Sequence, residues 1–247
     1  MMKTEDTKLL INNFSFIAVF ALLFICYCTI TSKLTVETNL SRSTSVAVEP
    51  KRIIVVDPGH GGEDGGAVGI NGVLEKELNL LISDDLCELF CFAGYEVIPT
   101  RTEDIMLYDR NVNYNGRKKV LDLAARLEIA NSAIPDLFVG IHMNAFPQQK
   151  YSGLTVYYSD HTPISCQTAE ALRHDVISLL QPQNNRETKS GKNIYLLDRA
   201  TYPAILVECG FLSNPEECEL LSTEEYRQKL TFVIFSSLTS FLEESKA

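Results

Sequence analysis

Three apolar stretches of this chain each end at a side chain that can bind a metal ion or move a proton. They are Ile53–Val56 followed by His60, Leu137–Ile141 followed by His142, and Ala204–Val207 followed by Glu208. Short runs of β-branched and aliphatic residues are typical of buried strands in a parallel sheet. In an open α/β sheet, ligands bind at the carboxyl ends of the strands. The pattern therefore predicts that three side chains far apart in sequence meet at one edge of a sheet.

Amphipathic helices are expected between these strands, at 75–93, 116–133, 164–180 and 224–243, with further strands at 95–99, 153–158 and 194–197. The side chains expected to face the core are Leu78, Leu81, Ile82, Leu86 and Leu89 in the first helix, Val120, Leu123, Ala124 and Leu127 in the second, and Tyr226, Leu230, Val233 and Phe241 in the last. Strands that alternate with helices predict an α/β fold. We expect a single doubly wound, mostly parallel sheet with helices on both faces.

The amino terminus carries an apolar segment from Phe14 to Ile30, with Lys3 and Lys8 before it and Lys33 after it. Its length suits a membrane span better than a signal-peptide core, and no Ala-x-Ala cleavage pattern follows. We interpret residues 1–32 as a membrane anchor or signal segment, with the uncleaved anchor favoured. Residues 33–50, rich in Thr, Ser and Val, are interpreted as a linker, and residues 51–247 as the catalytic domain.

The charge of the chain argues against a nucleic-acid partner, and its cysteines argue against a disulfide framework and a cysteine zinc site. The chain has 32 acidic and 22 basic residues, a net charge of −10, so it repels phosphate backbones and a nucleic-acid partner is not expected. The seven cysteines form no CxxC pair, which argues against a disulfide framework or a cysteine zinc site. Cys87 and Cys91 are expected to be buried thiols on the first helix.

The glycine-rich loop from Gly59 to Gly72 could cradle a phosphate, but Asp64 stands where the GxGxxG pattern requires glycine. The glycines are better explained as turns that bring His60 and Glu75 together. A catalytic zinc takes three protein ligands and leaves one position for water. His60, Glu75 and His142 meet that requirement.

Hydrolysis of an amide at such a site also needs a base, and Glu208 is the candidate. A fourth protein ligand would instead close the site and make the zinc structural. Arg126 and Asn144 are candidate substrate-binding residues. Each has a structural alternative, because Arg126 could pair with a carboxylate inside the fold and Asn144 could turn the chain.

Ordered motifs along residues 51–243 resemble the zinc-dependent N-acetylmuramoyl-L-alanine amidases of the amidase 3 group. The motifs are Asp57-Pro-Gly-His60-Gly-Gly, Glu75-Lys76-Glu77-Leu78-Asn79-Leu80, Thr100-Arg101, Ile141-His142-Met143-Asn144-Ala145, and Glu208 with Gly210-Phe211-Leu212-Ser213-Asn214. The resemblance implies that positions 60, 75 and 142 bind one zinc ion and that position 208 is the catalytic glutamate. It further implies cleavage of the amide between muramic acid and the first L-alanine of peptidoglycan.

Within that family, the short chain and its apolar amino-terminal segment are most similar to the germination-specific, spore-cortex members. This similarity implies an extracytoplasmic location, in the cell envelope or the forespore. A partner protein that completes the active site is compatible with the sequence. Met143 departs from the family pattern beside His142, which bears on substrate fit. Two alternatives stay open: a zinc peptidase that acts on free peptides, and a catalytically silent regulator of the cell wall.

Overall fold

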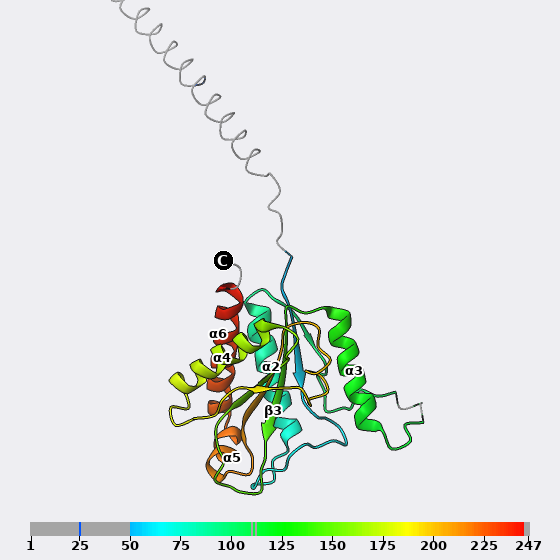
Figure 1. The fold of residues 1–247 in the computed structure, drawn as a ribbon, viewed down its shortest axis with the longest axis vertical. Helices are drawn as coiled ribbons and strands as arrows, with labels where there is room; N and C mark the ends of the chain where they lie inside the picture. The colour runs from blue at the N-terminus through cyan, green and yellow to red at the C-terminus, as the bar shows by residue number, and fades with distance from the viewer. Residues whose placement is uncertain (1–24, 26–49, 110, 112, 245–247) are drawn as a thin grey trace, which may run out of the picture. The chain divides into compact units, whose positions relative to one another are not determined.

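A six-stranded sheet with strand order β2-β1-β3-β6-β4-β5 forms the centre of the computed structural model (Figure 1). The structure describes residues 25, 50–109, 111 and 113–244. The strands are β1 (Ile53–Pro58), β2 (Glu96–Pro99), β3 (Leu137–Asn144), β4 (Thr155–Tyr158), β5 (Lys189–Ser190) and β6 (Ala204–Phe211). Neighbours β2, β1, β3 and β6 are parallel, whereas β4 pairs with β6 in the antiparallel sense. The mostly parallel sheet is thus confirmed.

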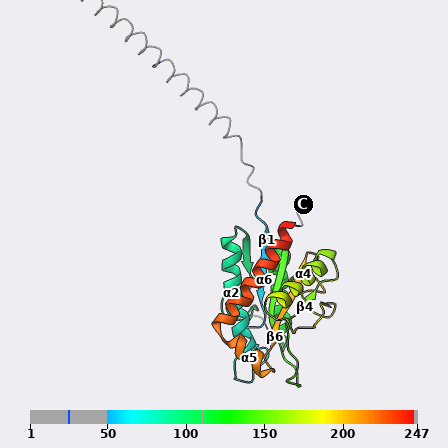
Figure 2. The same cartoon turned by 90° about the vertical axis from the view of Figure 1, so that its left-hand side faces the viewer.

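Helices cover both faces of this sheet. They are α2 (Glu75–Phe92), α3 (Lys118–Ala133), α4 (Pro163–Leu179), α5 (Pro215–Ser222) and α6 (Glu224–Glu244). Figure 2 shows α2, α4 and α6 side by side over one face, and Figure 1 shows α3 on the other. The short helix α5 directly follows β6, at the end of the sheet where β1 and β3 also end. The doubly wound α/β prediction is confirmed.

Two apolar clusters hold these layers together. The larger lies between the sheet and the α2, α4 and α6 layer, and includes Leu78, Ile82, Leu172 and Leu238. The smaller lies on the α3 side of the sheet and is built around Val55, Phe138 and Leu206. Alternate residues of the central strands therefore contribute to opposite clusters, as a sheet covered on both faces requires.

The core-facing stripes are only partly as predicted. Leu81 is 47% exposed and Val120 is 53% exposed, and Ala124 is exposed as well. On α3 the buried residues are Asp122, Arg126 and Ala130, with Leu123 and Leu127 partly buried beside them. The prediction for α3 is thus confirmed for Leu123 and Leu127 and wrong for Val120 and Ala124. Part of the inner face of α3 covers a charged loop, described below, and apolar periodicity cannot detect such a face.

The strand expected at 194–197 is also absent from the described sheet. This segment forms turns, in which the Ile194 N–H donates to the Gly191 carbonyl and the Asp198 N–H donates to the Ile194 carbonyl. Leu196 and Leu197 are buried as predicted for apolar residues, but the strand that completes the sheet is β5, just before them. Cys91, expected to be buried, is exposed, and Cys87 is partly buried.

Residues 1–32, interpreted above as an anchor or signal segment, and residues 33–50, interpreted as a linker, lie outside the described residues, apart from Ile25 and Pro50. Among the helices that the structure does describe, none is both long and apolar enough to cross a membrane.

Candidate active site

The ends of β1, β3 and β6 meet at one edge of the sheet, as the apolar stretches predict. Beyond the end of β1, the Gly59 N–H donates to the Ile141 carbonyl on β3 over 3.0 Å. On the other side of β3, His142 lies directly opposite Glu208 on β6. Directly paired residues of neighbouring strands project from the same face of a sheet. His142 and Glu208 therefore share the face to which the loop after β1 returns.

Glycines in the loop after β1 allow its backbone to lie close to the side chains of His142 and Glu75. A β-carbon at Gly59 would lie 2.2 Å from the His142 ring, and one at Gly66 would lie 2.5 Å from Oε2 of Glu75. Only glycine fits at such distances. His60 itself has a φ of 61°, an uncommon conformation for a residue with a side chain, and one that often marks a functional site.

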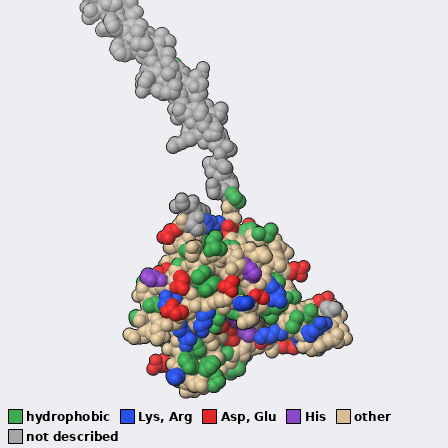
Figure 3. Space-filling model, in the orientation of Figure 1, with side chains coloured by type: hydrophobic (Ala, Val, Ile, Leu, Met, Phe, Trp, Pro, Cys, Tyr) green, Lys and Arg blue, Asp and Glu red, His purple; other side chains and the backbone are tan. Residues whose placement is uncertain are grey.

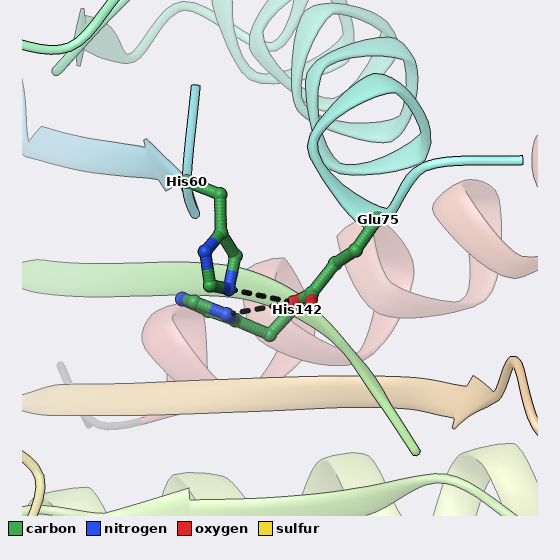
Figure 4. Close-up of side chains that lie close together, drawn as sticks. All are labelled: His60, Glu75 and His142. Atoms are coloured by element: carbon green, nitrogen blue, oxygen red, sulfur yellow. Dashed lines mark hydrogen bonds and ion pairs between the residues drawn. The ribbon is translucent and has the colours of Figure 1, made fainter. Parts of the chain in front are cut away.

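Glu75 is the focus of the side-chain cluster shown in Figure 4. Its Oε1 lies 3.0 Å from Nδ1 of His142 and 3.2 Å from Nε2 of His60. The same oxygen accepts the Met143 N–H over 3.0 Å, and Oε2 accepts the Ala67 N–H over 2.7 Å. Burial alone would raise the pKa of Glu75, but the hydrogen bonds and charges of the two histidines outweigh burial and hold it far below its ordinary value.

The ligand atoms offered by His60, Glu75 and His142 all lie within 4.8 Å of one another. Two imidazole nitrogens and one carboxylate are a donor set that zinc prefers in hydrolytic enzymes. The structure therefore brings together the three residues predicted as zinc ligands, in an arrangement that fits the ion.

Asp64 contacts His60 on the side of the ring away from Glu75, a role that we did not predict from the sequence. Its Oδ2 lies 3.0 Å from Nδ1 of His60 and 3.0 Å from Nζ of Lys119. Metal-binding histidines commonly have a carboxylate beside their second ring nitrogen, and Asp64 is close enough to Nδ1 of His60 for an ion pair, although the geometry is not that of a hydrogen bond. Burial lowers the pKa of His60, but the Glu75 and Asp64 carboxylates reverse this and leave it raised. Asp64, the residue that breaks the phosphate-loop pattern, thus contacts the ring nitrogen of His60 that does not face Glu75.

Glu208 has a very different environment from Glu75. Its Oε2 is buried and has no hydrogen-bond partner in the described part of the chain. Burial, with a further contribution from the Glu75 charge, raises the pKa of Glu208 to about 6. A carboxylate of this kind is ionised at neutral pH and is basic enough to take up a proton.

Arg126 is 1% exposed and all of its donors are used inside the fold. Its Nη1 donates to Oδ1 of Asp57 and to the Pro58 carbonyl, each over 2.7 Å, and its Nε donates to Asp122 over 2.8 Å. Its Nη2 donates to the His60 carbonyl over 2.6 Å. Of the two alternatives for Arg126, the structure favours the structural one, because the side chain holds the His60 loop against α3.

Asn144, the other predicted substrate-binding residue, is the last residue of β3, two positions beyond His142. Its carbonyl accepts the Leu212 N–H over 2.8 Å, and its side chain is partly buried. Asn144 therefore lies at the correct edge, and its role in binding remains a prediction. Arg101, which we did not single out for the site, also holds the loop: it donates to the carbonyls of Pro58 and Gly59.

A cavity of about 90 Å³ opens beside the two histidines. Its walls include His60, His142, Asp64, Lys119 and Leu196. Asp57, Asp122 and Arg126 also line it, so the cavity lies on the α3 side of the two histidines. The buried segment 194–197 therefore forms part of the site wall, not part of the sheet.

Comparison with known proteins gives consistent results. Residues 54–240 match the family model described as N-acetylmuramoyl-L-alanine amidase. The germination-specific N-acetylmuramoyl-L-alanine amidase of Bacillus subtilis is 34% identical over 193 residues, which cover 78% of this chain and 81% of that protein.

Solved structures show the same likeness. The CwlD amidase of Clostridioides difficile, in complex with the GerS lipoprotein, superposes with a TM-score of 0.74 at 36% identity, covering 78% of this chain and 99% of that one. The amidase AmiC2 of Nostoc punctiforme superposes with a TM-score of 0.66 at 30% identity, covering 78% and 97%.

Proposed function

The chain belongs to the N-acetylmuramoyl-L-alanine amidase family, and we propose that it hydrolyses the amide bond between N-acetylmuramic acid and L-alanine in peptidoglycan with the help of one zinc ion. The observation that carries this proposal is the convergence of His60, Glu75 and His142 at the strand edge that also holds Glu208. The chain is therefore an amidase, and the identity of its metal is the part that needs direct measurement.

In this proposal, His60, Glu75 and His142 hold the zinc. When bound, zinc lowers the pKa of a coordinated water toward ~7 and polarises the substrate carbonyl. Asp64 keeps the His60 ring in one orientation through its contact with Nδ1. Arg126 and Arg101 hold the backbone on both sides of His60, so the ring is positioned before substrate arrives.

Glu208 acts as the proton carrier. Its carboxylate accepts a proton from the attacking water and then donates that proton to the leaving amide nitrogen of L-alanine. The raised pKa, about 6, suits both halves of this cycle. A more acidic carboxyl would be a weaker base, and a much less acidic one would already be protonated near neutral pH.

A role in the spore cortex is supported by the germination-specific relative. We propose that the chain acts outside the cytoplasm, in the cell envelope or the forespore, with residues 1–32 as anchor or signal and 33–50 as linker. An accessory protein is also proposed, because the similar amidase of C. difficile is described in complex with a lipoprotein.

The direct test is mass spectrometry of peptidoglycan fragments after incubation with the purified full-length chain. We expect products with a free muramic acid carboxyl group and a new amino terminus at L-alanine, together with about one zinc per chain. Cleavage within free stem peptides that carry no sugar would instead support the peptidase alternative. Failure of the zinc-loaded protein to cleave any fragment would support the silent-regulator alternative.

A further inference from the structure

An arginine stacked against aromatic rings lies at the catalytic edge of the sheet. We call this group the Arg186 cluster and define it as Arg186, Phe146, Tyr151 and Phe211. The Arg186 Cζ lies 4.3 Å from the centre of the Phe211 ring and 5.7 Å from that of Tyr151. Phe146 packs edge-on against Tyr151 with ring centres 5.0 Å apart. These rings come from the segments that follow β3 and end β6, which also carry His142 and Glu208.

The guanidinium of Arg186 is held in place but keeps donors available. Its Nε donates to the Ser152 carbonyl over 2.6 Å, and its backbone N–H donates to Oδ1 of Asn184. Within the described residues, its two terminal nitrogens have no hydrogen-bond or ion-pair partner. Contact with the rings excludes water from one side of the guanidinium. A planar, oriented guanidinium with two terminal nitrogens available matches a carboxylate in the bidentate mode.

One acidic residue that interacts with Arg186, Glu217, already accepts two backbone hydrogen bonds. Glu217 interacts with Arg186 at longer range, but its Oε1 accepts the Gly153 N–H and its Oε2 accepts the Phe211 N–H, each over 2.8 Å. Glu217 thus holds the two backbone segments that carry the rings and does not pair closely with the arginine. This leaves a localised positive group on a chain whose net charge is −10, which favours an acidic ligand at this point.

The spacing along β6 relates the Arg186 cluster to the scissile bond. Phe211 is three residues beyond Glu208 and lies opposite Asn144, two residues beyond His142. At a rise of about 3.3 Å per residue, the ring lies about 7–10 Å beyond the catalytic pair. An extended peptide covers that distance in two or three residues. A substrate with its first amide at His142 and Glu208 would bring its second or third stem residue to Arg186.

We propose that Arg186 binds a free carboxylate of the peptide stem at its second or third residue and thereby makes the enzyme specific for acidic stems. This proposal rests on the proposed amidase function for its substrate. Figure 3 shows that Lys and Arg side chains are interspersed with acidic and exposed apolar side chains on the face drawn. Phe146 (47% exposed) and Tyr151 (36% exposed) line the approach, where they pack against the uncharged part of the stem.

The test compares muropeptides that differ only in one carboxylate, left free or converted to its amide at the second or at the third stem residue. The wild-type chain is expected to prefer the free acid at one of these positions by about 10- to 100-fold in kcat/KM, mainly through KM. Arg186→Gln should remove this preference and leave the rate on the amidated substrate within about threefold of wild type. Arg186→Lys, which keeps the charge without the planar fork, should restore part of it.

Arg199→Gln is the matched control, because Arg199 also stacks on a ring, with its Cζ 4.0 Å from the centre of Tyr195. Arg199 lies in the segment that precedes β6, and its ring partner Tyr195 does not belong to the Arg186 cluster. This variant should keep the wild-type preference. If Arg186→Gln lowered kcat/KM equally on free and amidated substrates, or left the preference intact, the carboxylate proposal would be wrong.

A binding measurement separates this proposal from the amidase function itself. The free stem tripeptide, with its carboxylates free or amidated, is titrated into the full-length wild-type chain and Arg186→Gln by calorimetry. If the wild-type chain binds the acid form more tightly than the amide form and Arg186→Gln does not, the subsite is supported, even if no muropeptide is cleaved. Equal binding of acid and amide forms by wild type contradicts it, even if cleavage at L-alanine is observed.

Discussion

Glu75 and Glu208 are two carboxylates at one sheet edge, and their surroundings give them opposite properties. Glu75 begins a helix and contacts two histidines and two backbone N–H groups. Glu208 ends a buried apolar run, and one of its oxygens has no partner among the described residues. The pKa of Glu75 is lowered and that of Glu208 is raised to about 6.

This difference shows how one side-chain type serves two purposes. A carboxylate that stays ionised under all working conditions is a good metal ligand, because protons do not compete with the cation. A carboxylate that is costly to ionise is a good proton carrier. Hydrogen-bond donors, and not residue type, therefore distinguish the expected ligand from the expected base.

The largest effect is expected from Glu75→Gln. Loss of the charged oxygen removes one of the three ligands, so we expect zinc content to fall well below one per chain and the rate to fall by more than ~10³-fold. Metal analysis of the dialysed protein and a muropeptide assay check this. Retention of stoichiometric zinc would contradict the role assigned to Glu75.

Glu208→Gln should separate metal binding from turnover. The amide keeps the shape of the side chain but cannot accept the proton, so kcat should fall by about 10²- to 10⁴-fold while zinc content stays at the wild-type level. The same two measurements apply. Loss of zinc in this variant would mean that Glu208 is a ligand, and the comparison with Glu75 would fail.

Gly66→Ala tests whether the position of the Glu75 carboxylate matters as much as its charge. The added β-carbon would lie 2.5 Å from Oε2 of Glu75, so the carboxylate must move. We expect zinc affinity about 10- to 100-fold weaker, comparable to the loss of a residue that orients a ligand. Competition with a chelator measures this.

Gly72→Ala is the matched control for that variant. Gly72 also has a positive φ, of 87°, but nothing lies within 4 Å of an added β-carbon. Backbone strain alone, about 1–2 kcal/mol, should lower stability in both variants, with zinc affinity changed only in Gly66→Ala. An equal loss of affinity in both would show that contact with Glu75 is not the cause.

The smallest effect is expected in the stability of the metal-free protein. Because the folded-state pKa of Glu208 is raised from 4.5 to about 6, ionisation of Glu208 destabilises the fold as pH rises through that window. Glu208→Gln should therefore stabilise the protein by about 1–2 kcal/mol at pH 8 and by little at pH 4. Urea denaturation at the two pH values measures the difference.

Glu75→Gln should show the opposite sign in the same experiment. Its folded-state pKa is lowered, so its ionisation stabilises the fold above the unfolded value of about 4.5 and this stability is lost as pH falls. The variant should be less stable than wild type at pH 8. Equal pH dependence in the two variants would show that their environments differ less than the structure indicates.

Much of the site could be predicted because its residues end local patterns. The apolar runs before His60, His142 and Glu208 encode buried strands, and parallel strands necessarily align their carboxyl ends. The helix that begins at Glu75 is likewise encoded by its own periodicity. For these residues, a rule about each segment was enough to place three strand ends at one edge.

Other parts of the site depend on which elements pack together, and no local pattern reports this. Arg126 is on the inner face of α3 because Asp57, 69 positions away in sequence, offers a buried carboxylate there. The apolar residues Leu196 and Leu197 predicted a strand, but their segment forms turns, and Leu196 lines the cavity beside the two histidines. Arg186 contacts rings from distant segments. Asp64 is only four residues from His60, but its second contact, with Lys119, comes from α3.

The sequence by itself determined the central strands, the four longer helices and the chemical types gathered at the strand ends, because hydrophobic period and chain direction are properties of short segments. Tertiary structure decided which carboxylate receives hydrogen bonds and which remains without them. That choice depends on burial and on donors supplied from elsewhere in the fold. It sets the pKa difference between Glu75 and Glu208, and with it the division between metal ligand and base that we propose.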